Sequence, residues 1–272
     1  MQDRLARRHN PLMPPRRAPT PAFEALAPGG AGLPLYRAAK RALLAAVESG
    51  RIAPGQALPA EGALAASLGI AVGTLRHAVD ELVAEHILVR RQGRGTFVAT
   101  HDANRFLFQF FHVERRDGRR EVPSVELLGF ARERAGDEAA EALHLREGDP
   151  LIVVENRLAL QGRAVVLDRL HLPAPMFRGL TERRLRERTG TIYQFYQRDY
   201  GITVVRAQER AAAVGADRHA ARALGLAPGT PVMRVRRTAL TFGDRPVEYR
   251  VSTIHTALHD YVHLLQRPMG GA

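Results

Sequence analysis

The feature that most constrains the fold of this chain is an internal repeat in its second half. Residues 138–165, EAAEALHLREGDPLIVVENRLALQGRAV, resemble residues 218–247, RHAARALGLAPGTPVMRVRRTALTFGDRPV. Each copy reads as an alanine-rich helix, a turn with glycine and proline, an alternating strand and a second glycine turn. The repeat is too long for a solenoid, so it predicts a two-fold α+β unit in which each half packs a helix against antiparallel strands. Such a layout places a pocket between the halves.

A different pattern occupies residues 35–99. Apolar residues recur with a helical period over 35–49 and again over 71–82, and a shorter helix is predicted between them over 59–68. The stretch HILVRRQGRGTFVA, residues 86–99, reads as two short strands joined by a glycine-rich turn. This order predicts a winged helix-turn-helix, in which the third helix enters the major groove of DNA and the hairpin wing flanks it.

The composition favours a polyanionic partner. The chain has 272 residues, so two domains are expected. Its formal net charge is +12, and Lys40 is the only lysine among the basic residues. Such a charge suits nucleic acid. The charge is spread along the chain, however, and residues 35–99 carry a net charge of only +3, so a generally basic protein is the alternative.

Cysteine is absent, which excludes disulfides, thiolate zinc sites and thiol catalysis. No apolar run approaches the roughly 20 residues of a membrane span. The N-terminal residues lack the apolar core of a secretory signal. We therefore expect a cytoplasmic protein with no membrane partner.

Sequence motifs add a family resemblance. The pieces PLY, SGRIAPGQALPAE, TLRHA and RRQGRGTFV, all within residues 34–98, resemble the GntR family of bacterial transcription regulators in their order and spacing. The motifs LLGFARERA, GDPLIVVENRLAL, TIYQFY, YGITV and RPVEYRVS, within roughly residues 105–265, resemble the UTRA effector domain of the histidine-utilisation branch of that family. The resemblance implies an α+β chain: an N-terminal winged helix-turn-helix and a C-terminal chorismate-lyase-like (UTRA) domain with an antiparallel sheet, which binds small molecules.

We divide the chain into four segments on this basis. Residues 1–32, rich in Pro, Ala and Arg, are expected to form a disordered basic arm. Residues 33–99 form the DNA-binding domain, residues 100–120 a linker and a first strand, and residues 121–267 the effector-binding domain. The arm is either an inert tail or a source of phosphate contacts. The arginines available for such contacts are Arg4, Arg7, Arg8, Arg16 and Arg17.

The resemblance also implies which residues meet DNA. In the family, bases and phosphates are contacted from the starts of both helices of the motif and from the wing tip. The matching residues here are Glu61, Thr74, Arg76, Gln92, Gly93 and Arg94. An arginine can fork onto guanine or phosphate, and a threonine hydroxyl can donate to a phosphate. The wing glycines let the backbone approach the minor groove, whose negative potential attracts an arginine.

The chain departs from the family pattern at the start of the third helix. The family usually has Ser and then Arg where this chain has Ala71 and Val72. The missing Ser is a missing N-cap, worth about 1 kcal/mol, and the missing Arg is a lost DNA contact. We hypothesise that Arg76, His77, the wing and the basic arm compensate. The alternative for Val72 is that its side chain packs on the first helix.

For the effector pocket, the resemblance implies one residue on an early strand, two at the start of a helix and two on the last strand of the repeat. The matching residues are Arg157, Thr191, Tyr193, Glu248 and Arg250. Two arginines and a hydroxyl suit a ligand with a carboxylate or a phosphate, and Glu248 could hold a hydroxyl or an amine. The alternative for each residue is a surface or fold-closing role. Asp168 and Tyr249 are candidates of second rank after these five.

Motifs of enzymes and of metal sites are missing from the sequence. It has no Ser/His/Asp spacing, no Walker-type glycine loop and no HExxH, so we expect no enzyme, no cofactor and no metal. The stretches HDANRF and YVHLL can each place a histidine near a carboxylate. Metal ligation by histidine and carboxylate therefore stays open as an alternative.

Together these observations predict a ligand-responsive transcription regulator, a repressor rather than an activator. We expect a homodimer that binds double-stranded DNA at a palindromic operator and is released or altered by a small anionic effector. A tenfold loss of operator affinity needs about 1.4 kcal/mol of linkage between the two sites. The alternatives are a non-specific basic DNA-binding protein and, because the related fold is a lyase, an enzyme.

Overall fold

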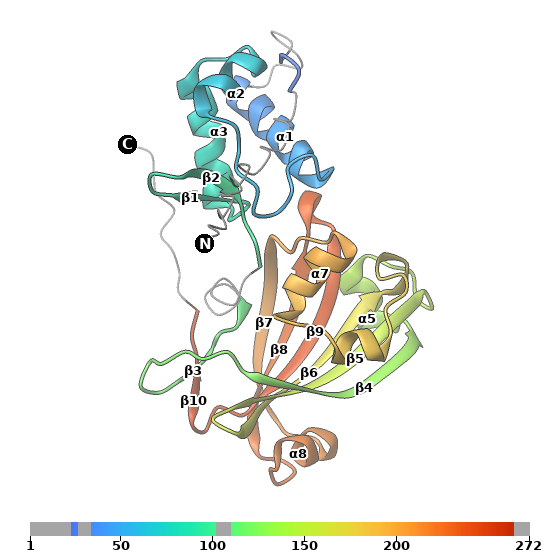
Figure 1. Ribbon diagram of the computed structural model, residues 1–272. Helices are drawn as coiled ribbons and strands as arrows, with labels where there is room; N and C mark the ends of the chain where they lie inside the picture. The colour runs from blue at the N-terminus through green and yellow to red at the C-terminus, as the bar shows by residue number, and fades with distance from the viewer. Residues whose placement is uncertain (1–22, 27–33, 102–109, 264–272) are drawn as a thin grey trace, which may run out of the picture.

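The computed structural model describes residues 23–26, 34–101 and 110–263. The arm predicted over residues 1–32 lies almost entirely outside the described residues, as does much of the linker, over 102–109. Figure 1 shows a small helical domain with a two-stranded wing and a larger domain built on a twisted sheet. In the described residues, no single helix is long and apolar enough to cross a membrane, although one bent helix pair reaches that length and composition jointly.

Three helices and a hairpin form the N-terminal domain. They are α1 (Leu35–Glu48), α2 (Glu61–Leu68), α3 (Val72–Ala84), β1 (Leu88–Arg91) and β2 (Gly95–Val98). The α2 and α3 helices are bent by 107° relative to one another, as in a helix-turn-helix. Their apolar faces close one core, whose buried members include Ala39, Leu43, Ile52, Leu64, Leu68, Leu75 and Leu82. The winged helix-turn-helix is confirmed.

A six-stranded antiparallel sheet forms the centre of the C-terminal domain, with the strand order β4-β5-β6-β9-β8-β7. Its strands are β4 (Ser124–Arg134), β5 (Pro150–Leu160), β6 (Arg163–Pro173), β7 (Arg206–Gly215), β8 (Pro231–Leu240) and β9 (Pro246–Ile254). Its helices are α5 (Asp137–Leu143), α6 (Glu182–Arg186), α7 (Ile192–Tyr200) and α8 (Arg218–Leu224), with short 3-10 turns η3 (Ala174–Met176) and η4 (Phe242–Asp244). A separate two-stranded ribbon pairs β3 (Val113–Arg115) with β10 (His259–Tyr261).

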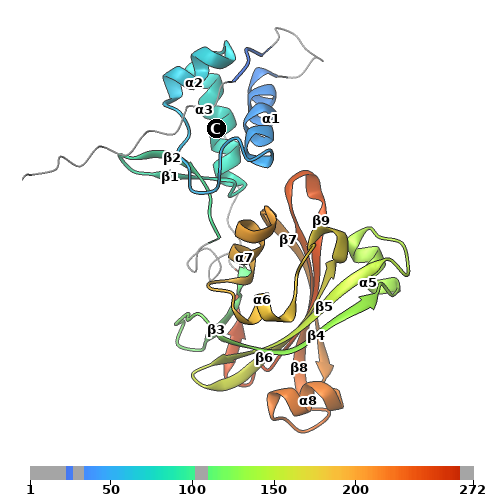
Figure 2. The ribbon, with the colours of Figure 1, turned by 45° about the vertical axis from the view of Figure 1, so that its right-hand side comes forward.

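The two faces of the large sheet carry different helices. Along β5, Ile152 and Val154 point to one face and Leu151 and Val153 to the other, because side chains alternate along a strand. The first face packs on α6 and α7, which lie in front of the sheet in Figure 2, and forms the largest core. The opposite face carries α5 and α8 over smaller apolar clusters. The polar site described below lies on the α7 face.

The predicted repeat is the architecture of this sheet. Hairpin β5–β6 corresponds to hairpin β8–β9, and β6 pairs with β9 at the centre. Each helix packs on a strand of the other half, α5 on β9 and α8 on β6. Both hairpins carry a register shift at the same place, after Leu158 and after Ala239. The copies slip relative to one another in the sequence because a tight turn joins β5 to β6, whereas η4 joins β8 to β9. The α+β fold class is confirmed.

The strand register also identifies equivalent positions in the two halves. Asn156 lies opposite Asp168 in the β5–β6 hairpin, and Arg237 lies opposite Arg250 in the β8–β9 hairpin. All four side chains are buried. The pair Asn156 and Asp168 in the first half therefore corresponds to the pair Arg237 and Arg250 in the second.

Candidate DNA-binding surface and effector cavity

The start of α3 lacks a side-chain cap and is exposed. Ala71 has extended backbone angles, with φ −66° and ψ 146°, and makes no capping hydrogen bond. Val72 is 36% exposed, so its side chain is outside the core that α1 and α3 share. Packing on the first helix therefore does not account for Val72. At the positions where the family usually has Ser and Arg, α3 therefore begins with two apolar residues and no side-chain cap.

The starts of α2 and α3 are joined by an ion pair. Nε of Arg76 donates to Oε2 of Glu61 over 2.6 Å, and both side chains are exposed. Thr74, two residues earlier on α3, is half-buried. Glu61 therefore holds the Arg76 guanidinium near the N-termini of both helices, and the two side chains form one exposed ion pair.

His77 lies on another side of α3. Its ring stacks on Tyr36 of α1 with 4.1 Å between the ring centroids and 6° between the planes. Its Nε2 lies 3.8 Å from Oε1 of Glu81. The structure therefore does not bring His77 together with Arg76, and a contact between α1 and α3 accounts for its position.

The wing tip presents the remaining predicted residues. Gln92, Gly93 and Arg94 are exposed between β1 and β2, and the Arg94 N–H donates to the Arg91 carbonyl over 2.9 Å to close the turn. Gly93 has a φ of 67°, which favours glycine. Arg91 lies over the Phe97 ring at 4.7 Å. Within the described part of the chain, Arg94 forms no ion pair, so its guanidinium is available at the tip.

In the C-terminal domain, a cavity of about 280 Å³ opens on the α7 face of the sheet. It lies between β5, β6, β9 and the loop that leads into α7. Its apolar wall is formed by Val122, Pro123, Val125, Leu158 and Ile192. Its polar lining is formed by Asn156, Asp168, Arg188, Gly190, Thr191 and Arg250. A mostly apolar cavity with a few convergent polar groups is the usual form of a small-molecule site.

Two polar atoms in this cavity lack partners. Among the described residues, neither Oδ1 of Asn156 nor Nε of Arg188 has a hydrogen-bond partner, and both atoms are buried. Burial lowers the pKa of the Arg188 guanidinium below its ordinary value, and no described carboxylate forms an ion pair with it. Native proteins rarely leave such groups unsatisfied. Nη1 of Arg188 already donates to the Leu185 carbonyl over 2.7 Å, so an acceptor is missing for its Nε alone, and a donor is missing for Oδ1 of Asn156.

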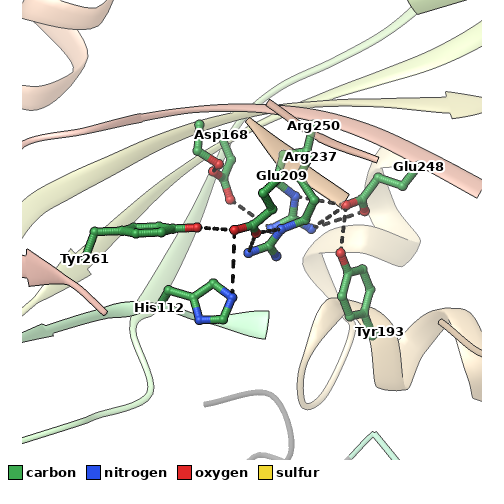
Figure 3. Close-up of polar contacts among 9 residues, drawn as sticks. His112, Asp168, Tyr193, Glu209, Arg237, Glu248, Arg250 and Tyr261 are labelled. Atoms are coloured by element: carbon green, nitrogen blue, oxygen red, sulfur yellow. Dashed lines mark hydrogen bonds and ion pairs between the residues drawn. The ribbon is translucent and has the colours of Figure 1, made fainter. Parts of the chain in front are cut away.

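Arg250 is by contrast fully engaged by carboxylates (Figure 3). Its Nε and Nη2 donate to the two oxygens of Glu248 over 2.9 and 3.1 Å, and its Nη1 donates to Asp168 over 3.1 Å. Burial acts to lower the pKa of Arg250, but Glu248 outweighs it and holds that pKa above its ordinary value. Ser252 donates to the other oxygen of Asp168 over 2.5 Å. This network fixes the Arg250 guanidinium at the cavity wall.

Glu248 and Tyr193 lie beneath the cavity instead of lining it. Both are 0% exposed. The hydroxyls of Tyr193 and Tyr196 donate to Glu248 over 3.0 and 2.7 Å, and burial raises the pKa of Tyr193 well above its ordinary value of 10.0. With Arg250 also bound, Glu248 has no oxygen left for a ligand, contrary to the expectation that it holds a hydroxyl or an amine.

Thr191 caps the helix that faces the cavity. Its Oγ1 accepts from the Gln194 N–H over 3.2 Å and donates to the His101 carbonyl over 3.2 Å. Gly190 before it has a φ of 75°, which favours glycine. This turn brings the N-terminal end of α7 and its partial positive charge to the cavity.

Arg157 does not belong to the cavity, which corrects the expectation from the sequence. Its guanidinium lies on the opposite face of the sheet, where it pairs with Glu126 over 2.5 Å and donates to the Ala223 carbonyl of α8 over 3.3 Å. Its neighbour Asn156 faces the cavity, because successive residues of a strand point to opposite faces. The sequence analysis missed Asn156 and Arg188 and ranked Asp168, which lines the cavity, below the residues that it chose.

Two family models match the chain. Residues 118–260 match the UTRA domain, and residues 35–98 match the bacterial regulatory proteins of the gntR family.

The chain is also similar to individual proteins. It is 25% identical over 238 residues to the HTH-type transcriptional repressor NagR of Bacillus subtilis (strain 168), covering 86% of this chain and 96% of that protein. It is 35% identical over 133 residues to a histidine utilization repressor of Pseudomonas putida, covering 48% of this chain and 54% of that protein. Among solved structures, the ligand-binding domain of a GntR-family regulator from Bordetella bronchiseptica aligns with a TM-score of 0.56 and 33% identity, over 58% of this chain and 99% of that one.

Proposed function

Because this chain belongs to the gntR family of bacterial transcription regulators and carries that family's UTRA domain, we propose that it is a cytoplasmic repressor that a small anionic effector releases from DNA. The matched families and relatives are regulators and not enzymes. The proposed form is a homodimer on a palindromic operator, in which each helix-turn-helix reads one half-site.

The pair of unsatisfied atoms in the cavity carries the effector proposal. Arg188 offers a buried N–H donor and a positive charge without a described counter-ion, and the N-terminal end of α7 adds to that positive potential. These groups suit a carboxylate. Oδ1 of Asn156 can only accept, so the effector needs an N–H or O–H donor at its other end. We therefore propose a small carboxylate with one such donor, held between Arg188 and Asn156.

A short chain of hydrogen bonds supports linkage between this cavity and the DNA-binding domain. Thr191 holds the His101 carbonyl, and Gln197 of α7 accepts from the His101 N–H over 3.3 Å and donates to the Ala99 carbonyl over 3.4 Å. Ala99 directly follows the wing strand β2. An effector that moves the start of α7 would therefore pull on the segment from which the DNA-binding domain departs. This gives the effector different contacts in two states, as linkage requires.

The proposed DNA contacts come from the Glu61–Arg76 ion pair, from Thr74 and from the wing tip. Val72 tests their geometry, since Val72→Arg restores a cation at the exposed start of α3. We expect operator binding to tighten severalfold and the slope of log K against log[salt] to steepen by about 0.9 for each added phosphate contact. Arg37→Ala, at the exposed start of α1, is the matched control. Unchanged affinity and slope in Val72→Arg would place the start of α3 away from the backbone of DNA.

The experiment that tests the whole proposal is selection of the purified protein against a random DNA library, followed by effector titration. A recovered palindrome is expected, and its affinity should fall at least tenfold with saturating effector. Urocanate, which has a carboxylate and an N–H donor, is the first probe, and an amino-sugar phosphate is the comparator. Recovery of no sequence, together with salt-sensitive bulk binding, would instead favour the non-specific basic protein.

A further inference from the structure

A second polar cluster lies away from the effector cavity. His112 precedes β3, Glu209 lies on β7, and His263 follows β10. One ligand atom from each residue lies within 4.8 Å of the other two. Nε2 of His112 is 3.9 Å from Oε2 of Glu209, and the two histidine rings are 4.9 Å apart between centroids. Figure 3 shows His112 and Tyr261 pointing toward Glu209.

The β3–β10 ribbon brings His112 and His263 side by side and places them next to Glu209 of β7. The Val262 N–H donates to the His112 carbonyl over 2.7 Å, which continues the ribbon past its last paired residue. Because side chains alternate along an extended segment, Tyr261 and His263 point to the same side. Tyr261 donates its hydroxyl to Oε2 of Glu209, so His263 is directed to the same carboxylate.

We propose that His112, Glu209 and His263 bind one divalent transition-metal ion of the zinc type. Two imidazoles and one carboxylate are a donor set that zinc accepts, with a water in the fourth position. Zinc requires ligand atoms about 2.0–2.2 Å from the ion, so the three atoms must move closer than they are now. His263 is exposed and can make that movement, whereas His112 is only 8% exposed and keeps its place.

The carboxylate is oriented before any ion arrives. Arg237 is 6% exposed and donates to Oε1 of Glu209, while Tyr261 donates to Oε2. The guanidinium charge opposes a second cation, but it binds the oxygen that the ion does not use. The lone pair of Oε2 that Tyr261 leaves free can face the two histidines. Such partners that orient a ligand are a regular part of metal sites.

The site opens to a cavity of about 1040 Å³ that both domains line. Lys40 and Glu85 of the DNA-binding domain line it together with the three proposed ligands. Water can therefore fill the fourth position. A bound ion would tie the segment after β10 to the edge strand β7 beside that cavity, which is the structural effect we expect.

The test is a calorimetric titration of Zn²⁺ into untagged, full-length protein freed of metal with a chelator. We expect one saturable site per chain. His263→Ala removes a ligand from an exposed position, so the fold should persist, and affinity should fall at least about 100-fold, because loss of an outer-shell partner alone costs about 10–100-fold. His219→Ala is the control, since His219 is exposed and pairs with Glu155 elsewhere.

Two further measurements separate this site from adventitious binding to other histidines. Co²⁺ in place of Zn²⁺ should give the intense visible absorption of a four-coordinate ion, and His263→Ala should lose it. Zn²⁺ should also slow amide hydrogen exchange over residues 259–263. Equal Zn²⁺ affinity in His263→Ala and the wild type, or no saturable site in the wild type, would overturn the proposal. Neither result depends on the effector or on DNA.

Discussion

The two halves of the C-terminal sheet share a backbone plan but differ in how their buried polar positions are satisfied. In the second half, Arg237 is neutralised by Glu209 and Arg250 by Glu248. In the first half, Asp168 pairs with Arg250, but the carbonyl oxygen of Asn156 has no described partner. The first half also supplies most of the strand residues that line the cavity, while β9 of the second half supplies Arg250. The buried polar groups of the second half are thus satisfied by ion pairs, whereas the first half has an unsatisfied group that a ligand could bind.

The halves also differ on the α7 face of their inner strands. Val166 of β6 corresponds to Glu248 of β9, because each lies opposite the residue just before the register shift of its hairpin. Val166 belongs to the apolar core, whereas Glu248 binds Arg250 and two tyrosine hydroxyls. Equivalent positions of the repeat therefore hold a core residue in one half and the centre of a polar network in the other, and the predictions below probe that difference.

The largest expected effect is the loss of this centre. Glu248→Val gives the second half the residue of the first, and it leaves Arg250 buried with only Asp168 as its partner. Breaking a buried ion pair from one side costs about 3–5 kcal/mol, so the free energy of unfolding should fall by about that amount in urea titrations. Glu126→Ala is the control, because it removes the exposed partner of Arg157 and should cost about 0–1 kcal/mol. Similar losses for both variants would contradict a special role of the buried network.

The next effect concerns the unsatisfied oxygen of the first half. Asn156→Leu removes the acceptor and fills part of the cavity, so effector affinity measured by calorimetry should fall at least about tenfold, since an unmade hydrogen bond in a buried site costs about 1–3 kcal/mol. The free energy of unfolding should be unchanged or higher, because a buried unpaired group is lost. Arg157→Ala is the matched control on the opposite face and should keep effector affinity. If Arg157→Ala lost effector affinity and Asn156→Leu kept it, the effector would bind on the face of the sheet that carries Arg157.

The sequence predicted the repeat, the winged helix-turn-helix and the helix that begins beside Thr191, because these depend on local periodicity and short motifs. The resemblance pointed to Arg157, whereas its neighbour Asn156 lines the cavity. A shift of one residue moves every side chain of a strand to the other face of the sheet, and a motif match does not determine which of two neighbouring residues faces the cavity. Arg188 was missed since it lies in a run of arginines with no local signal. His112, Glu209 and His263 come from distant segments that only the strand order brings together.

The smallest expected effect concerns the N-terminal caps of α5 and α8, each of which packs on a strand of the other half. Asp217 caps α8 by accepting from the Ala220 N–H over 2.8 Å, whereas Gly136 at the start of α5 makes no side-chain cap. Asp217→Ala should lower the free energy of unfolding by about 1 kcal/mol, and Gly136→Asp should raise it by a few tenths of that. Urea titrations of both variants measure these changes in the free energy of unfolding. Because each helix packs on a strand of the other half, the two changes should still appear in one cooperative transition, and separate transitions would mean that the halves unfold independently.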